Sequence, residues 1–422
     1  MADPLKSPPR KDPQRRTRQA TLPPPARSRA GLAFSAWAAR GEFRLQVCGD
    51  CGTTSYPPRD VCPNCWSSRL EWQPAAPTGR LLADTVLHTS TNVYFRERMP
   101  WRVGTVEHES GVALLAHIHS DVPTPAQGGQ PVRLTVRTDK SGQGVIVALP
   151  VEDTPHMNDE KQLRELSASV RHRRVLITDV RTDFGQALAL KVREAGASRV
   201  FAGVAEPWKP FPGRDALATA DHIEQVSLDV TQGDSVLELA GAIGGKTDIL
   251  INTASHVRPG STVGRNGLTA AKDEMETNYF GLLRLLQFFG PAMQGRAADG
   301  DNNAVCWVNL LSIYALSNWP AYATTSASHA AALSLAQGAR ADFQPSGIKV
   351  LNVFHGPLES EWYQPVSPPK VTPAKLARVV VDALEAGLEE KVVGDIAQDV
   401  MARWQENPAV LERELTQDGG AL

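Results

Sequence analysis

The chain has 422 residues, which is enough for two or three domains of ordinary size. Hydrophobic residues make up 42% and charged residues 21%, a balance typical of soluble globular proteins, and the formal net charge of −2 points to neither a nucleic acid nor an acidic partner. No apolar run is long enough to span a bilayer, and the N-terminus lacks the apolar core of a secretory signal, so we expect a soluble, cytoplasmic protein.

Residues 1–30 are rich in proline, arginine and lysine and contain almost no apolar residues to bury. This composition predicts a disordered basic tail. A docking tail or an organelle-targeting peptide is the functional alternative, although the prolines would break an amphipathic targeting helix.

Residues 31–77 are predicted to form a short helix followed by a metal-binding ribbon. Four of the five cysteines form two C-x-x-C pairs, namely Cys48 with Cys51 and Cys62 with Cys65. Two thiolates from each pair can complete a tetrahedron around one ion, and four protein ligands leave no open position, so the metal would be structural. Zinc is the expected ion, with iron or four free thiols as alternatives. The fifth cysteine, Cys306, falls in an apolar strand and is most simply a small buried residue.

Residues 78–153 have the character of a small β-barrel, in which Gly and Pro separate short apolar runs. The predicted strands are residues 81–87, 103–107, 112–118, 132–136 and 145–149. Residues 154–173 are polar and are predicted to be a linker with a possible helical turn.

The first 153 residues carry a family resemblance. The segments "FSAWAARGEFRLQVCGDCGTTSYPPRDVCPNC", "PTGRLLADTVLH", "PWRVGTVE" and "GGQPVRLTV" follow one another in the order of the family that fuses a rubredoxin-like zinc ribbon to an OB fold. The resemblance covers residues 31–153 and implies a protein that accompanies a thiolase or thiolase-like aldolase in acyl-CoA metabolism, without a reaction of its own. OB folds also bind single-stranded nucleic acid. Here the small number of candidate stacking aromatics (Tyr94, Phe95, Trp101) and the mixed charge argue against that function.

Residues 174–422 alternate buried-type strands with helical stretches, which predicts an α/β doubly wound parallel sheet. The predicted strands are residues 175–177, 200–204, 249–251, 305–309 and 350–354. Four segments make this part similar to the short-chain dehydrogenase/reductase family: "LDVTQ" with Asp229, "DILINTAS" with Asn252, "METNYFGLLRLLQ" with Asn278, and "VNLLSIYAL" with Ser312. The segment "IKVLNVFHGPLES" resembles the sixth strand of the family, with His355 where proline is usual.

The cofactor-binding turn departs from that family. Its T-G-x-x-x-G-x-G pattern becomes Thr178-Asp179-Val180-Arg181-Thr182-Asp183-Phe184-Gly185, in which only Gly185 remains. Asp179 and Asp183 each add a Cβ and a negative charge, and one such charge at about 4 Å from a phosphate costs on the order of 4 kcal/mol at an effective dielectric near 20. Asp183 could itself cap the helix, and Arg181 could offset the charge. Gly185, Asp229 and Asn252 are therefore the remnant of an NAD(P) site.

The catalytic pair of the family is also replaced. At the family spacing from Ser312, the tyrosine position falls on Thr325 and the lysine position on His329. A threonine hydroxyl is too weak an acid to replace a phenol. Tyr322 lies three residues earlier and has Ser326, not lysine, four residues after it. Ser312, Asn278, His329 and Tyr322 are the candidate catalytic residues, each with a structural alternative in which it is satisfied locally.

An intact scaffold with a dismantled site predicts a pseudoenzyme. The preferred hypothesis is a non-catalytic accessory subunit of acyl-CoA and lipid metabolism, whose first half docks on a thiolase-like enzyme. Its second half would pair with itself or with an active reductase through residues 274–289 and 322–343, giving a homo- or hetero-oligomer. The alternative is an active NAD(P)-dependent 3-hydroxyacyl-CoA dehydrogenase or 3-ketoacyl reductase with a non-standard site.

Overall fold

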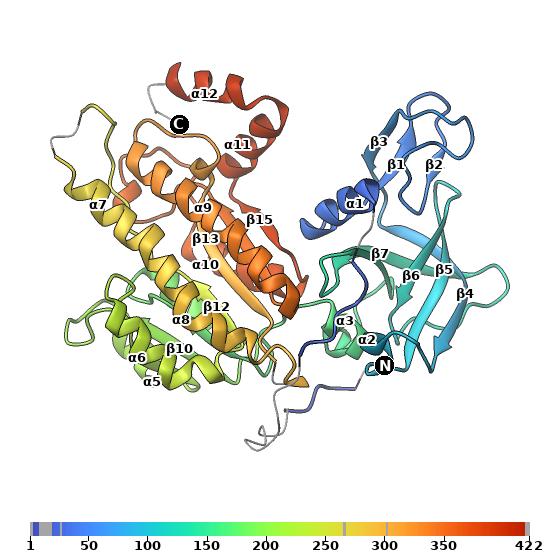
Figure 1. Ribbon diagram of the computed structural model, residues 1–422, viewed down its shortest axis with the longest axis horizontal. Helices are drawn as coiled ribbons and strands as arrows, with labels where there is room; N and C mark the ends of the chain where they lie inside the picture. The colour runs from blue at the N-terminus through green and yellow to red at the C-terminus, as the bar shows by residue number, and fades with distance from the viewer. Residues whose placement is uncertain (1–2, 8–18, 26–27, 265–266, 301–302, 418–422) are drawn as a thin grey trace. The chain divides into compact units, whose positions relative to one another are not determined.

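The computed structural model describes residues 3–7, 19–25, 28–264, 267–300 and 303–417. The chain forms two compact units, one built mainly from residues 20–169 and the other mainly from residues 170–383 and 390–417 (Figure 1). Each unit is described by itself below. Among the described residues, no helix combines the length and the apolarity needed to cross a bilayer.

The first unit begins with helix α1 (Arg29–Ala39), whose N-cap is Ser28; the Ser28 hydroxyl accepts a hydrogen bond from the backbone N–H of Gly31 at 3.0 Å. A three-stranded antiparallel sheet follows, in the order β2 (Thr54–Ser55), β1 (Arg44–Cys48) and β3 (Leu70–Pro74). Cys48 is the last residue of β1, and the other three cysteines of the two C-x-x-C pairs lie in the loops of this sheet, so the zinc-ribbon architecture expected from the sequence is present.

Five strands then close into a barrel in the order β4-β5-β6-β8-β7, which confirms the OB-like barrel. Their bounds are β4 (Thr78–Leu87), β5 (Trp101–His108), β6 (Ala113–Ile118), β7 (Gln130–Thr138) and β8 (Gly144–Leu149), with the short helix α2 (Val93–Arg96) between β4 and β5. The alternate, inward-facing side chains of these strands are fully buried, for example Leu81, Leu114 and Ile146. Phe34 of α1 packs into the same core and stacks on Trp72 of the ribbon at 6.0 Å between ring centroids, so helix, ribbon and barrel form one hydrophobic unit.

Two sequence expectations about the flanks of the barrel differ from the structure. Within the predicted tail, the described residues 3–7 and 20–25 belong to the first unit and Pro23 is buried, whereas the composition predicted disorder; residues 1–2, 8–18 and 26–27 lie outside the described residues. The segment after the barrel contains a 3-10 turn (Met157–Asp159) and helix α3 (Lys161–Glu165), whose Leu163 packs on Val147 and Leu149 of β8. In both segments an apolar side chain is buried, Pro23 in the first and Leu163 in the second, although most of the surrounding residues are polar.

The second unit contains a seven-stranded parallel sheet in the order β11-β10-β9-β12-β13-β14-β15, which confirms the doubly wound fold. The central strands are β9 (Arg174–Ile177), β12 (Ile249–Asn252), β13 (Cys306–Ser312) and β14 (Lys349–His355), and they are almost wholly buried. The outer strands are β10 (Arg199–Val204), β11 (Ile223–Ser227) and β15 (Glu390–Val393). The strand order reverses between β9 and β12, and this switch point is where folds of this kind place their ligands.

Helices cover this sheet. They are α4 (Asp183–Glu194), α5 (Arg214–Thr219), α6 (Gly233–Ile243), α7 (Thr269–Met275), α8 (Leu282–Gln294), α9 (Ala323–Phe343), α10 (Pro373–Glu385), α11 (Asp395–Glu406) and α12 (Pro408–Gln417). Helices α8 and α9 lie side by side (Figure 1), and α9 contacts β13 and β14. A π-helical segment, Glu276–Gly281, joins α7 to α8 and carries Asn278. Such segments are rare and are often found at functional sites.

Candidate functional site

The four cysteines of the ribbon form the first candidate site. All four Sγ atoms lie within 4.8 Å of one another, with Cys48 3.6 Å from Cys65 and Cys51 3.6 Å from Cys62. Tetrahedral zinc at the usual Zn–S length separates its sulfur ligands by about 3.8 Å, so the cluster has the dimensions of such a site. The turn after each pair is fixed by a backbone hydrogen bond, from Gly52 N to Cys48 O and from Trp66 N to Cys62 O. These four thiols fit a structural zinc ion.

The second candidate site lies at the switch point of the sheet, where the remnant cofactor turn begins. The Thr178 hydroxyl, at the end of β9, donates to the side-chain oxygen of Asn252 at 2.9 Å and accepts from the backbone N–H of Thr253 at 2.9 Å. Both side chains are buried. Asn252, predicted as a cofactor-binding residue, therefore ties β12 to β9.

The turn itself is held together by an ion pair. Asp179 accepts the backbone N–H of Arg181 at 2.9 Å, and its Oδ2 lies 2.8 Å from the guanidinium of Arg181. Glu206, just beyond β10, lies 3.7 Å from the same guanidinium. These carboxylates raise the pKa of Arg181, chiefly through the hydrogen bonds from Asp179. The negative charge of Asp179, which was expected to lie beside a cofactor phosphate, is therefore paired with Arg181 within the turn.

The start of α4 differs from the sequence expectation that Asp183 caps it. The cap is Thr182, whose hydroxyl accepts from the backbone N–H of Gly185 at 3.1 Å, whereas Asp183 lies exposed in the first turn. A Cβ on Gly185 would come 2.2 Å from the carbonyl oxygen of Asp179, so close packing of the turn on the helix already requires this glycine. Asp229, the other remnant residue, accepts from the backbone and hydroxyl of Thr231 at 2.9 and 2.7 Å.

At the position predicted for the tyrosine of the family motif, the buried Thr325 is hydrogen-bonded to the buried Glu274. The Thr325 hydroxyl donates to Oε1 of Glu274 at 2.6 Å, and the same oxygen accepts the backbone N–H of Arg258 at 3.0 Å. Glu274 is wholly buried, and its Oε2 has no hydrogen-bond partner within the described chain. Glu274 was not among the predicted site residues, although its place four positions before Asn278, about one helical turn away, was a signal that could have identified it.

The lysine position is occupied by His329, which is enclosed. Its Nδ1 accepts the backbone N–H of Ser312 at 3.3 Å, and its Nε2 is buried without a partner in the described chain. Burial lowers the pKa of His329 to about 3, and the nearby His355 lowers it further in the same sense. The Ser312 hydroxyl accepts from the backbone N–H of Tyr314 at 3.3 Å. Ser312 and His329 are thus brought together by a structural contact.

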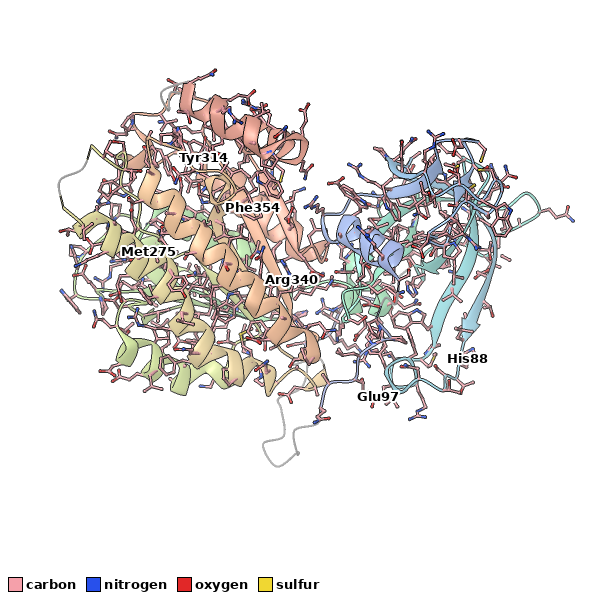
Figure 2. All side chains as sticks on the ribbon, turned by 45° about the horizontal axis from the view of Figure 1, so that its top comes forward. His88, Glu97, Met275, Tyr314, Arg340 and Phe354 are labelled. Carbon is pink, nitrogen blue, oxygen red and sulfur yellow. The ribbon has the colours of Figure 1, made fainter. Side chains whose placement is uncertain are left out.

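The other two candidate catalytic residues make contacts elsewhere. Asn278 donates to the backbone oxygen of His256 and to the hydroxyl of Ser328, both at 2.9 Å. The Tyr322 hydroxyl donates to the backbone oxygen of Trp362 at 2.7 Å, and its ring stacks between Trp319 and Tyr363 at 4.6 and 5.1 Å. Burial raises the pKa of Tyr322, because it disfavours the charged phenolate. The stack also includes Tyr314, which is labelled in Figure 2.

Three family models match the chain. Residues 38–71 match the rubredoxin-like zinc ribbon domain of ChsH2, and residues 72–137 match the C-terminal OB-fold domain of ChsH2. Residues 173–370 match the short chain dehydrogenase model.

Individual relatives match the second unit. Uncharacterized oxidoreductases of Mycobacterium bovis and Mycobacterium tuberculosis are each 26% identical over 270 residues, which is 60% of this chain and 76% of each relative. The crystal structure of a short chain dehydrogenase from Burkholderia cenocepacia in complex with NADP is similar with a TM-score of 0.53 and 30% identity. That match covers 58% of this chain and 98% of the Burkholderia protein.

Proposed function

The chain belongs to the short-chain dehydrogenase family through residues 173–370 and carries the zinc-ribbon and OB-fold domains of ChsH2 in residues 38–137, and on this basis we propose that it is a non-catalytic subunit of acyl-CoA metabolism. In this proposal the ribbon–barrel unit binds a thiolase-like enzyme that handles acyl-CoA thioesters. The reductase-like unit pairs with a second copy or with an active reductase, so that a 3-oxoacyl thioester stays close to both enzymes.

The observation that carries the proposal is the state of the proton-donor position. A reductase of this family needs a phenol with a lysine beside it, whereas here the Thr325 hydroxyl is bound to the buried carboxylate of Glu274. His329 cannot replace the lysine cation, because burial keeps it neutral far below pH 7. The Tyr322 hydroxyl donates its hydrogen bond to the backbone oxygen of Trp362, and no charged neighbour lowers its pKa in the described chain. Each candidate donor is used in a hydrogen bond that holds the fold.

The turn that would hold the cofactor phosphate gives weaker support to the proposal that the chain is non-catalytic. Arg181 is the cation nearest to the former phosphate site on this turn, and Asp179 and Glu206 both compete for it. A phosphate would have to displace at least one carboxylate from that guanidinium. The same ion pair is also the observation that favours the alternative function, because a neutralised Asp179 repels a phosphate less than a free one would. The Burkholderia relative was crystallised in complex with NADP.

A direct test is the titration of NADPH and NADH into the full chain, followed by fluorescence, beside the matched variant Asp179→Gly/Asp183→Gly. The wild type is expected to show no saturation at millimolar cofactor and no turnover of acetoacetyl-CoA. The double variant restores the two glycines and removes two negative charges, so it is expected to bind NADPH at least about tenfold more tightly, still without turnover.

Micromolar binding by the wild type, with turnover that disappears in Tyr322→Phe or His329→Gln, would overturn the proposal and establish the active dehydrogenase. The docking part has a separate readout. The full chain should co-purify with a thiolase-like enzyme or an active reductase from its native extract, and recovery of the chain alone would contradict it.

A further inference from the structure

A cavity of about 310 Å³ lies in the ribbon–barrel unit, on the outer face of the barrel. Its position follows from the alternation of β6, in which Leu114 and Ala116 are buried in the core while Leu115, between them, is 62% exposed. Leu115 and His117 share that outer face with Val103 of β5, which pairs with His117. The cavity therefore lies at that outer face, with Ala116 and Ile146 of the barrel core also in its lining. Its volume is at the lower end of the size range of small-molecule sites.

The walls of the cavity are mainly aromatic. Tyr94 and Phe95 come from α2, Trp101 from the start of β5, and Tyr56 from the ribbon. Phe95 makes edge-to-face contacts with both Tyr94 and Trp101, at 5.1 and 5.7 Å between ring centroids. Tyr94 and Trp101 are almost fully buried, so these rings are held in place rather than collapsed into the space between them.

Most polar groups of the lining are already engaged. Trp101 Nε1 donates to His117 Nδ1 at 2.7 Å, the Tyr94 hydroxyl to Glu165 at 3.4 Å, and the Tyr56 hydroxyl to the backbone oxygen of Leu115 at 3.4 Å. The carboxylate of Asp139 accepts three hydrogen bonds from its own loop, two from Ser141 and one from the backbone of Gln143.

Two groups of the lining are left over. Because His117 Nδ1 accepts from Trp101, a neutral His117 carries its proton on Nε2. Burial lowers the pKa of His117 to about 4, so the ring is neutral at pH 7. Among the described residues, the His117 side chain forms a hydrogen bond only through Nδ1, and Gln143 forms hydrogen bonds only through its backbone. The cavity thus combines an aromatic wall with one spare N–H donor, one spare amide and no unpaired cation.

We propose that this cavity is a binding site for a small, uncharged, largely apolar molecule that carries one carbonyl or amide group. The carbonyl oxygen would accept from His117 Nε2, and Gln143 would bind the remaining polar edge, while the aromatic rings cover the apolar part. A phosphate-bearing molecule does not fit as a whole, because no lining residue is a lysine or an arginine. This inference does not depend on the function proposed for the reductase-like unit.

The segment from Thr21 to Pro25 forms a lid on this site. Pro23 and Pro24 line the cavity, and Pro23 is buried. The Thr21 hydroxyl donates to Glu97, labelled in Figure 2, at 2.9 Å and accepts from Arg98 at 3.1 Å, while the Ser141 hydroxyl reaches Pro24 O at 3.3 Å. Prolines have no N–H to join a sheet, so these side-chain contacts at the surface hold the segment, and a ligand can displace it at little cost.

The test uses the neutral fluorescent probe N-phenyl-1-naphthylamine with the full chain. We expect one probe to bind per chain and octanamide to displace it, whereas octylammonium and octanoate do not. Val103→Phe fills the cavity and Leu115→Asp places a charge at its mouth; each should weaken probe binding about tenfold or more. Val151→Phe, an exposed position outside the lining, is the matched control and should bind as the wild type does.

Two further variants divide the proposal into its parts. Gln143→Leu should weaken competition by octanamide and leave binding of the probe intact, and Thr21→Ala should speed probe association. Unchanged fold in each variant is checked by circular dichroism. Equal probe binding by the wild type, Val103→Phe and Leu115→Asp would overturn the site, as would equal displacement by octylammonium and octanamide. An unchanged association rate in Thr21→Ala would overturn the lid.

Discussion

At the scale of single residues, the second unit converts the positions of a reductase site into structural contacts. The sequence predicted that threonine and histidine replace the catalytic pair, and it left open whether His329 is an acid or a locally satisfied residue. In the structure only one ring nitrogen of His329 is satisfied. Its Nδ1 accepts a hydrogen bond from the backbone of Ser312, whereas its Nε2 is buried without a partner in the described chain. A group buried in this way favours its neutral form, and this makes the stability of the fold depend on pH.

The first prediction concerns that dependence. An unfolded histidine has a pKa of about 6.5, whereas burial lowers that of folded His329 to about 3, so between these values only the unfolded chain takes up the proton. The free energy of unfolding should therefore fall as the pH falls below about 6.5, by up to roughly 1.4 kcal/mol per pH unit for this one group.

The control for this prediction is His329→Gln, which keeps a hydrogen-bond acceptor and cannot be protonated. Denaturant unfolding between pH 7 and pH 4, measured as the midpoint for both proteins, should show a shallower decline for the variant. Parallel curves for the wild type and the variant would show that His329 is already accessible to protons in the folded chain.

At the scale of elements, buried strands were the most predictable part of the molecule. The strands of the barrel and the central strands β9, β12, β13 and β14 carry apolar runs bounded by turn residues, and each was placed to within a few residues. The edge strands β11 and β15 were missed, since their sequences are polar and only one of their side chains, Val393, is buried. The π-helical segment around Asn278 was also missed, because one extra residue in a turn leaves no mark on a helical pattern.

The ribbon supplies the prediction at this scale. One of its four thiols ends a strand and three lie on loops, in a sheet whose longest strands have five residues, so the metal should supply much of its folding free energy. Cys62→Ser removes one buried ligand and is expected to abolish stoichiometric zinc, measured by atomic absorption, and to loosen the ribbon. Cys306→Ser changes the cysteine outside the cluster and should keep one zinc per chain. Zinc retained at full stoichiometry by Cys62→Ser would contradict this assignment.

At the scale of the whole molecule, the order of motifs along the chain predicted the order of architectures, namely ribbon, barrel and doubly wound sheet. Local motifs do not reveal which segments join which unit. The proline-rich segment at residues 19–25 and helix α3 were read as tail and linker, yet both pack on the barrel. Each covers an apolar surface that exists only after the strands have closed.

The final prediction follows from the two compact units. Calorimetry of the full chain should show two transitions, and removal of zinc with a chelator should lower the temperature of only one. A chain that starts at Val170 should retain the chelator-insensitive transition at nearly the same temperature. A single transition that shifts as a whole on chelation would show that the units unfold together.

The sequence by itself determined the fold class of each half and the four thiols of the ribbon, and it predicted the loss of the catalytic tyrosine and lysine. These features depend on residue type, spacing and period, which are local properties of the chain. Only the tertiary structure showed that Arg181 pairs with Asp179, that Thr182 caps α4 and that Glu274 accepts a hydrogen bond from the Thr325 hydroxyl. The same holds for the aromatic cavity, whose walls come from the tail, the ribbon, α2 and the barrel. Contacts between residues far apart in the chain form only where the fold brings their side chains together, and the spacing of residues along the sequence does not specify those neighbours.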